Sequence, residues 1–443
     1  MKKFIQTLKN IWSIEELRKK ILFTLLLVFI YRIGSFIVLP GIDPTKLSDE
    51  NTKSGMLGLL DAFVGGAFHK ASIFALGIMP YISASIFMQL MTILVPSMQK
   101  IQKEGESGRK KINQWTRYLT VIVTAFQAAA YIGYLHSQNK DAMIQSFESY
   151  FAVSTVIILT VGTLFVMWLG EKITDKGLGN GTSIIIMMGI LARLPEAFTQ
   201  EWSARAIRGG GGLLIFLIEI AFLVAIVMGL IMLIQGTRRV PVNYAKQIVG
   251  NRQFGGARNF LPLKVNAAGV MPIIFAQAIL FLPTVFSGFG TGGGAWVQYF
   301  TDHKSLVYMI VYSVCVIAFT FLYTALIFNP KQMAEDLKRN NGFIPGVKPG
   351  QDTADYIGTI MDRITLPGAI LLAFVGILPG IFELVFGMQQ SFSTFFGGTS
   401  LLIMVGVILD TLQQIETQLL MRQYDGLMSS GRIQGRQTVA SGM

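Results

Sequence analysis

Titratable side chains inside apolar stretches are the first candidates for chemistry in this sequence. Such stretches carry Glu219, Glu383, Asp410 and Glu416, with Arg32 as the lone base of the first stretch. Charges at membrane depth are costly and often functional. However, Arg32 and Glu383 lie toward the ends of their stretches, and Asp410 and Glu416 share one half of the last. We therefore favour structural pairing over a proton or ion relay.

Motifs for covalent or nucleotide chemistry are absent from the sequence. It contains no GxxxxGK[ST] phosphate loop, no HExxH zinc motif and no GxSxG nucleophile motif. The glycine-rich residues 177–183 follow no predicted strand, which favours a tight turn over a dinucleotide site. His69, His136 and His303 lie far apart, and Cys315 is the single cysteine. We predict no enzyme activity, no cofactor and no metal, so any nucleotide-driven step would need a partner.

Composition indicates an integral membrane protein. Of the 443 residues, 52% are hydrophobic and only 14% are charged, whereas soluble domains carry about 25% charged residues. Residues 1–20 are basic and amphipathic and lack the apolar core of a removed signal peptide. A soluble protein with a very apolar interior is disfavoured.

The helices that must position these residues are apolar runs of about 20 residues, the length that spans a bilayer. Closed β-barrels would show alternation instead of continuous runs, so the fold class is all-α. The ten expected spans are 21–39, 71–95, 117–136, 151–170, 182–199, 212–235, 267–286, 305–328, 364–387 and 397–419.

The charge distribution predicts how these spans are oriented. Of the 37 Lys and Arg residues, 28 fall in one alternating set of loops together with both termini. The positive-inside rule places that set in the cytoplasm. Two of its members, 237–264 and 331–363, are long and polar. They are either solvated loops or docking surfaces for an anionic partner such as RNA or an acidic protein face.

Ten spans divide into five plus five, near residue 205. Because five is odd, a duplicated unit would enter the membrane in opposite senses, as in transporters with inverted repeats. The expected halves are 1–205 and 206–443. Residues 53–70 are glycine-rich, semi-apolar and too short to span, so they form either an interfacial segment or a re-entrant one.

Isoleucines recur at helical spacing near the middle of several spans. Residues four apart share a helix face, which groups Ile78 with Ile82, and Ile186 with Thr182. Ile274 and Ile403 lie in later spans. From the residues alone, lipid contact or helix packing is the favoured interpretation.

Longer sequence blocks resemble the SecY family, the large subunits of the bacterial protein-translocation channel. They run in collinear order from near residue 15 to about residue 428. The blocks are YRIGSFIVLPGID (31–43), ASIFALGIMPYISASI (71–86), GLGNGTSIII (177–186), VNYAKQ (242–247), LPLKVNAAGVMPIIFA (261–276), GFIPGVKPGQDTADYI (342–357) and GGTSLLI (397–403).

The resemblance implies ten helices in two inverted halves around an hourglass pore. Thr182 stands where the family has an aliphatic residue. The second and third helices, with the seventh and eighth, would form a lateral gate. The implied pore constriction consists of Ile78, Ile82, Thr182, Ile186, Ile274 and Ile403. The implied plug, about 53–66, includes Leu57, Leu59, Leu60, Asp61, Phe63, Gly65 and Gly66.

The resemblance also implies partners. SecE and SecG would be small subunits, and the SecA motor ATPase or a translating ribosome would dock on the cytoplasmic loops. Signal peptides, nascent preproteins and membrane lipid would pass through or beside the channel, with SecDF and a YidC-type insertase as further partners. Lys348 stands where the family carries an arginine. The implied docking residues are Arg238, Arg239, Lys246, Arg252, Arg258 and Lys348.

Three classes of function are compatible with a multi-span helical protein of this kind. The favoured one is a passive protein-conducting channel in the bacterial plasma (inner) membrane, multi-pass with both termini cytoplasmic. It would pass signal-bearing unfolded polypeptides and release transmembrane segments into lipid. The alternatives are a secondary transporter of a small solute and an intramembrane enzyme, and the lack of clustered midplane charges or nucleophile–base pairs counts against both.

Overall fold

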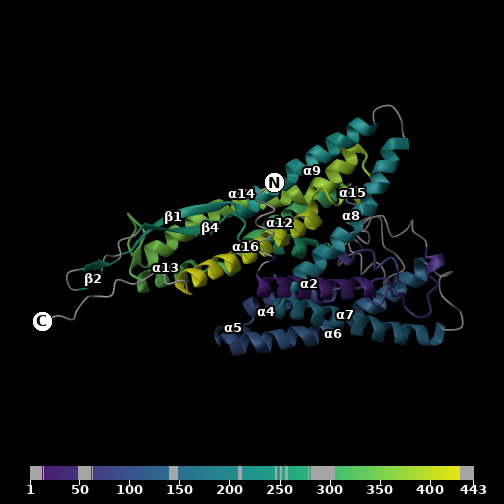
Figure 1. The fold of residues 1–443 in the computed structure, drawn as a ribbon, viewed down its shortest axis with the longest axis horizontal. Helices are drawn as coiled ribbons and strands as arrows, with labels where there is room; N and C mark the ends of the chain where they lie inside the picture. Colours follow the sequence, from purple (N-terminus) through teal and green to yellow (C-terminus); the bar gives the residue numbers. More distant parts are fainter. Residues whose placement is uncertain are drawn as a thin grey trace.

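The structure is a computed structural model in which helices dominate (Figure 1). The structure describes residues 12, 14–47, 61, 63–138, 148–207, 212–244, 247–249, 252–254, 258–277, 279–280 and 305–429.

The amino-terminal helices gather in one group, drawn in purple and blue at the bottom of Figure 1. The group contains α2 (Glu15–Gly34), α4 (Met79–Leu94), α6 (Glu106–Gln138) and α7 (Glu148–Lys176). α6 packs against both α4 and α7, and α2 packs against α7. A short 3-10 turn, η1 (Pro44–Lys46), follows α2.

The carboxy-terminal helices form a second group, drawn in teal, green and yellow in Figure 1. The group contains α9 (Gly212–Gln235), α12 (Leu306–Ile327), α14 (Gln351–Phe386) and α16 (Gly398–Ser429). α12 runs along α14, and α16 contacts both α14 and α9. The short helix α15 (Gln390–Ser393) lies between α14 and α16 in sequence.

The helix α8 (Gly181–Ile207) connects the two groups. It contacts α2 and α7 on one side and α9, α15 and α16 on the other. In Figure 1 it rises from the lower group to the far end of the upper one. Contacts on α8 therefore decide how the two groups are held together.

Seven described helices are long and apolar enough to cross a membrane, and the bent pair α4–α5 would make eight. α5 (Pro96–Lys103) turns away from α4 by 103°. The other two expected spans fall on α2, whose sequence is rich in charges, and on 267–286, which lies partly outside the described residues. A multi-span helical protein is confirmed, and the ten-span count stays a prediction.

The predicted helix 71–95 is wrong at its start. α4 begins at Met79, and the preceding residues are turns. Pro80 therefore lies in the first helical turn, where its missing N–H breaks no helical hydrogen bond. Gly77 has a φ of +52°, a conformation that favours glycine. Pro80 is therefore at the start of α4 and does not interrupt it.

The two long polar segments are structured. β1 (Thr237–Tyr244) pairs antiparallel with β4 (Arg258–Lys264) and with β5 (Gly342–Phe343). β2 (Gln247–Val249) pairs with β3 (Arg252–Phe254). The larger sheet packs its apolar face on the start of α14, which begins at Gln351, well before the predicted 364. A further helix, α13 (Pro330–Arg339), packs beside α14.

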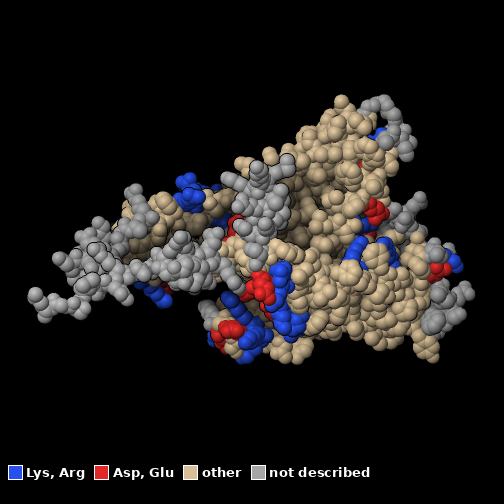
Figure 2. All heavy atoms as spheres, viewed as in Figure 1, with Lys and Arg blue, Asp and Glu red and all other residues tan. Residues whose placement is uncertain are grey.

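The surface agrees with membrane insertion. Leu26, Phe29, Phe126 and Met232 are among the large apolar side chains exposed on the outer faces of the helices. Figure 2 shows a mostly uncharged face, with Lys, Arg, Asp and Glu gathered near the helix ends and the sheet. An exposed apolar surface of this extent is stable against lipid and not against water.

Candidate functional site: an apolar constriction and its neighbours

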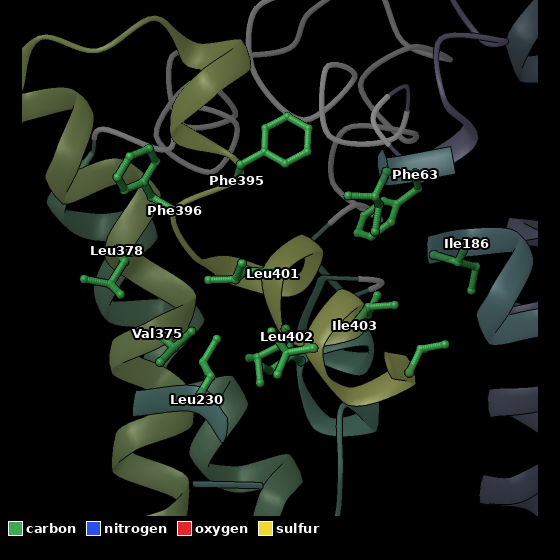
Figure 3. Close-up of a cluster of buried hydrophobic side chains, with 14 of the residues drawn as sticks. Phe63, Ile186, Leu230, Val375, Leu378, Phe395, Phe396, Leu401, Leu402 and Ile403 are labelled. Carbon is green, nitrogen blue, oxygen red and sulfur yellow. The ribbon is translucent and has the colours of Figure 1, made fainter. Parts of the chain in front are cut away.

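Five isoleucines of the predicted constriction share one hydrophobic cluster. Ile78, Ile186 and Ile403 are buried, and Ile82 and Ile274 pack against the same cluster while partly buried. They come from four separate stretches of sequence and from both helix groups. Figure 3 shows Ile186 and Ile403 on separate helices of this cluster. The structure therefore places these side chains in the same large apolar core, and their role as a constriction stays a prediction.

The pair Ile78–Ile82 keeps its helical spacing although Ile78 is the N-cap residue of α4. The amide of Ile82 donates to the carbonyl oxygen of Ile78 at 3.1 Å. The two side chains are therefore one turn apart, as their spacing predicted.

Thr182 has a different role from the isoleucines. Its hydroxyl donates to Asn180 Oδ1 at 2.6 Å, and its amide donates to the same oxygen at 3.1 Å. Asparagine is a preferred capping residue at a helix start. A Cβ on Gly170 of α7 would lie 3.3 Å from the Thr182 methyl group. Asn180 thus caps α8, and Thr182 in the first turn donates to that cap and faces α7, which its spacing from Ile186 did not predict.

A polar contact joins two of the isoleucine-bearing segments. The Gln277 amide donates to the Thr399 hydroxyl across the carboxy-terminal group. Gln277 lies three residues after Ile274, and Thr399 lies four residues before Ile403. The sequence analysis did not name Gln277 and Thr399. Their positions, one helical turn from Ile274 and Ile403, could have indicated a contact between the two segments.

The predicted plug contributes to the same cluster. Phe63 is buried among the isoleucines (Figure 3). Gly65 and Gly66 have φ values of +70° and +87°, which other residues rarely adopt. A Cβ on Gly189 of α8 would collide with the carbonyl of Phe63. Close backbone approach thus seats this segment on α8. The plug residues Leu57, Leu59 and Leu60 lie outside the described residues.

Two arginines hold the segment in place. Arg32 Nη1 of α2 donates to the Gly65 carbonyl at 2.9 Å. Arg193 of α8 forms an ion pair with Asp61, which is 2% exposed. Asp61 also accepts from the backbone amide of His69 at 2.9 Å. The predicted pairing of Arg32 is confirmed, whereas Arg193 was missed; its signal was a lone base within an expected span.

The other intramembrane acids also have assigned surroundings. Glu219 pairs with Arg205 at 2.6 Å, and Glu383 accepts from the Ser393 hydroxyl. Asp410 and Glu416 are exposed on α16. No group of three or more His, Cys, Asp or Glu in the described part of the chain could hold a metal ion. These contacts are structural pairs and do not form a relay.

Most of the predicted docking residues lie in the two β-sheets or close to them in sequence. Arg238 and Arg239 are exposed on β1, and Arg252 and Arg258 lie on β3 and β4. Lys348 is exposed, and its carbonyl accepts from the Thr353 hydroxyl at 2.8 Å. Lys246 lies outside the described residues. The exposed side chains of Arg238 and Arg239 therefore lie on a β-sheet, which was not predicted.

Comparison with known proteins identifies relatives over nearly the whole chain. A family model described as SecY matches residues 72–412. A protein translocase subunit SecY of Streptomyces scabiei is 43% identical over 430 residues, covering 93% of this chain and 97% of the relative. The subunit of that name from Halalkalibacterium halodurans is 43% identical over 432 residues, covering 96% and 99%.

Solved structures share the fold at low sequence identity. A structure described as that of a protein conducting channel aligns with a TM-score of 0.65 at 16% identity, covering 96% of this chain and 95% of that one. Sec61 in a canine ribosome-channel complex aligns with a TM-score of 0.62 at 15% identity, covering 96% and 95%.

Fold and sequence relatives agree on the class of protein. The relatives carry the name of a translocase subunit, and the structural neighbours are channels. Such a subunit is a non-enzymatic, multi-pass membrane protein, which matches the paired acids and the apolar cluster. The chain belongs to the SecY family and is a protein-conducting channel subunit of the translocase.

Proposed function

We propose that the cluster around Ile78, Ile82, Ile186, Ile274 and Ile403 is the closed constriction through which unfolded, signal-bearing polypeptides cross the membrane. The observation that carries this proposal is the burial of these side chains, from both helix groups, together with Phe63. A translocating chain has no fixed sequence, so its pore needs side chains that yield around any residue. A narrow apolar ring also resists ion flow by dewetting when empty.

Residues 53–66 act as the plug in this proposal. Phe63 covers the cluster, and Arg32 and Arg193 hold Gly65 and Asp61. The two arginines come from α2 and α8, so a movement of either helix loosens the segment.

The lateral gate would lie between α4 and α6 on one side and the helix beginning at 271 and α12 on the other. Opening this seam would let an apolar signal segment leave into lipid. The proposal includes ten spans in two inverted halves, 1–205 and 206–443, with both termini in the cytoplasm of a bacterium and the chain in its plasma membrane.

Partners follow from the exposed basic platform. Arg238 and Arg239 on β1 and Lys348 nearby present positive charge on a rigid support. We assign this surface to the SecA motor and to ribosomal RNA, whose negative charges it complements. SecE and SecG would complete the complex against the exposed apolar helix faces.

Site-specific photocrosslinking tests the path. Membrane vesicles carrying this chain with SecE, SecG and SecA receive a signal-bearing preprotein stalled in transit. A photoreactive residue at Ile82 or Ile274 should crosslink to the preprotein. The matched control is Phe29, which is 63% exposed on the outer face of α2 and should crosslink only to lipid or a subunit. The proposal would be wrong if the vesicles took up only a small solute and neither position crosslinked to the preprotein.

A further inference from the structure

A cavity lies inside the carboxy-terminal group, among α12, α14, α15 and the start of α16. Four of its wall residues are glycines, namely Gly376, Gly380, Gly397 and Gly398, so the space exists where side chains are missing. The volume open to the centre of a water molecule is about 30 Å³. One water molecule needs about 10–15 Å³ by this measure. The cavity therefore has room for about two.

The cavity wall carries a buried hydroxyl group without a partner. Tyr312 of α12 is 1% exposed, and its hydroxyl makes no hydrogen bond within the part of the chain that the structure describes. Its ring stacks on the ring of Tyr308, with 5.7 Å between the centroids. A Cβ on Gly376 of α14 would lie 2.5 Å from Tyr312 Cε1 and 3.2 Å from the hydroxyl oxygen. Contacts with Tyr308 and Gly376 therefore hold the ring, and a hydroxyl left unpaired there would cost free energy.

Other polar groups lie around the same space. Thr399 is the second residue of α16 and lines the cavity, and its hydroxyl accepts from the side-chain amide of Gln277. A hydroxyl that accepts still has its own proton to donate. Pro379 also lines the cavity and has no N–H, so the carbonyl of Val375 in α14 lacks its helical donor. That carbonyl lies against the residue before α16, because a Cβ on Gly397 would be 2.6 Å from its oxygen.

Water suits this set of groups better than an empty space or an ion does. Cavities lined by apolar side chains stay dry, whereas polar cavities hold water molecules that make about two to four hydrogen bonds each. Hydroxyl groups and carbonyl oxygens supply both donors and acceptors for such molecules. The Glu383 carboxylate on the wall accepts from the Ser393 hydroxyl. The negative charge therefore has a partner in the protein and does not require a bound cation.

We propose that this cavity is a hydration site in which about two water molecules join the Tyr312 hydroxyl of α12 to Thr399 in the first turn of α16. Thr399 lies four residues before Ile403, and its partner Gln277 lies three residues after Ile274. The water molecules thus connect α12 to both segments that carry the constriction candidates of the carboxy-terminal group. This connection rests on the proposed function and names what holds Ile274 and Ile403 in the closed position.

Radiolytic labelling tests whether water is present. A short X-ray pulse converts water into hydroxyl radicals, which oxidise the side chains beside each water molecule, and mass spectrometry locates the oxidised residues. The channel complex is used in nanodiscs without preprotein. Tyr131 of α6 is the matched control, because it is 2% exposed and its hydroxyl donates to the Phe68 carbonyl at 2.7 Å. Tyr312 should be oxidised at least about fivefold faster than Tyr131, and equal rates would overturn the hydration site.

The direction of a stability change gives a second test. Tyr312→Phe removes only the hydroxyl group. If water binds that group, its loss should lower the Tm by about 1–2 °C, as the loss of one hydrogen bond does. Tyr131→Phe, which removes a paired hydroxyl, should lower the Tm similarly. In a dry cavity Tyr312→Phe would remove an unpaired buried group, so an unchanged or raised Tm would contradict the proposal.

The connection between α12 and α16 predicts a change in function. Without the Tyr312 hydroxyl the closed constriction should open more readily, so vesicles with Tyr312→Phe should take up a preprotein with a weakened signal about threefold faster. Thr320→Val is the control, because it removes a buried hydroxyl that donates within α12, to the Val316 carbonyl. Uptake by Tyr312→Phe at the unmodified rate would overturn the connection. If the unmodified channel took up no preprotein, the proposed function would fail, while labelling and Tm would still decide the hydration site.

Discussion

The amino-terminal half of α8, here called its inner half, and the carboxy-terminal half, here called its outer half, are held by different kinds of contact. Toward the constriction, Ile186 packs among other apolar side chains and forms no directional bond. Toward the outer end, Arg205 makes three charge-assisted hydrogen bonds in a buried setting. Dispersion contacts are individually weak and can be exchanged one at a time, whereas a buried ion pair resists separation. The apolar contacts of α8 can therefore rearrange, whereas its buried ion pairs must stay together.

The segment at 61–66 combines both kinds of contact. Phe63 enters the apolar cluster, while Asp61 and Gly65 are held by arginines. It can therefore leave the constriction by exchanging apolar neighbours, but its release also requires two polar contacts to break. In its proposed role as the plug, such a segment would seal the pore at rest without being permanently fixed there.

The largest expected effect comes from breaking a buried ionic cluster near the carboxy-terminal end of α8, here called the clamp: Glu201, Arg205 and Glu219. Arg205→Met removes the cation from two buried carboxylates and should destabilise the protein by about 3–5 kcal/mol. Thermal unfolding in detergent measures this loss. Glu219→Gln is the milder companion, because it keeps an acceptor for Arg205 and removes one buried negative charge. Equal stability of Arg205→Met and the unmodified chain would show that the clamp does not hold.

The next effect sharpens the apolar side of the comparison. Ile403→Asn places an amide in the cluster, which should disfavour the closed state by about 1–3 kcal/mol. Ion conductance of vesicles should rise, and preproteins with weakened signals should be accepted more readily. Ile403→Leu, which keeps the apolar character, should behave like the unmodified channel. Unchanged leak and unchanged signal selectivity in Ile403→Asn would count against a gating role.

A smaller effect is expected at the segment that combines both contacts. Asp61→Asn removes the buried charge that pairs with Arg193 and should weaken the seating of the segment by about 1.5 kcal/mol. Photocrosslinking from a photoreactive residue at Phe63 to α8 should then fall, with little change in thermal stability. Arg193→Gln should produce a similar decrease, and the double variant should add little, because both changes remove the same pair. Additive losses would mean that the two residues act separately.

The smallest effect on stability belongs to the basic platform. Arg238→Gln with Arg239→Gln should alter unfolding by less than about 0.5 kcal/mol, because both side chains are exposed. Binding of SecA or ribosomes to vesicles should nevertheless weaken and become less sensitive to salt. Lys331→Gln, an exposed residue on α13, is the charge-matched comparison for a single loss. A normal salt dependence in the double variant would remove these arginines from the docking surface.

The sequence predicted the class of the molecule and many of its helices. Low charge and long apolar runs are local properties, so the seven long apolar helices all lie in or overlap expected spans. The structure places five of the six constriction candidates in one cluster. Thr182 differs from them in that its hydroxyl donates to Asn180, which caps α8, and its place in the constriction stays a prediction.

Other predictions failed because a local sequence pattern does not show which backbone conformation the folded chain adopts. Apolar residues at 71–78 read as helix, yet they form turns that approach the preceding segment, where Val38 bridges Ser72. Polar residues at 237–264 read as loop, yet they pair as strands supported by an apolar face on α14. In both places a contact with a distant segment decided the structure.

By itself, the sequence determined a basic, helical, multi-span protein with apolar candidates for a constriction and no catalytic motif. Only the tertiary structure decided which charges meet: Arg193 with Asp61, and Arg205 with Glu201 and Glu219. Helix periodicity reports the faces within one element, but the partner of a buried charge depends on how separate helices are placed. For this reason the ion pairs of α8 became visible only in the folded chain.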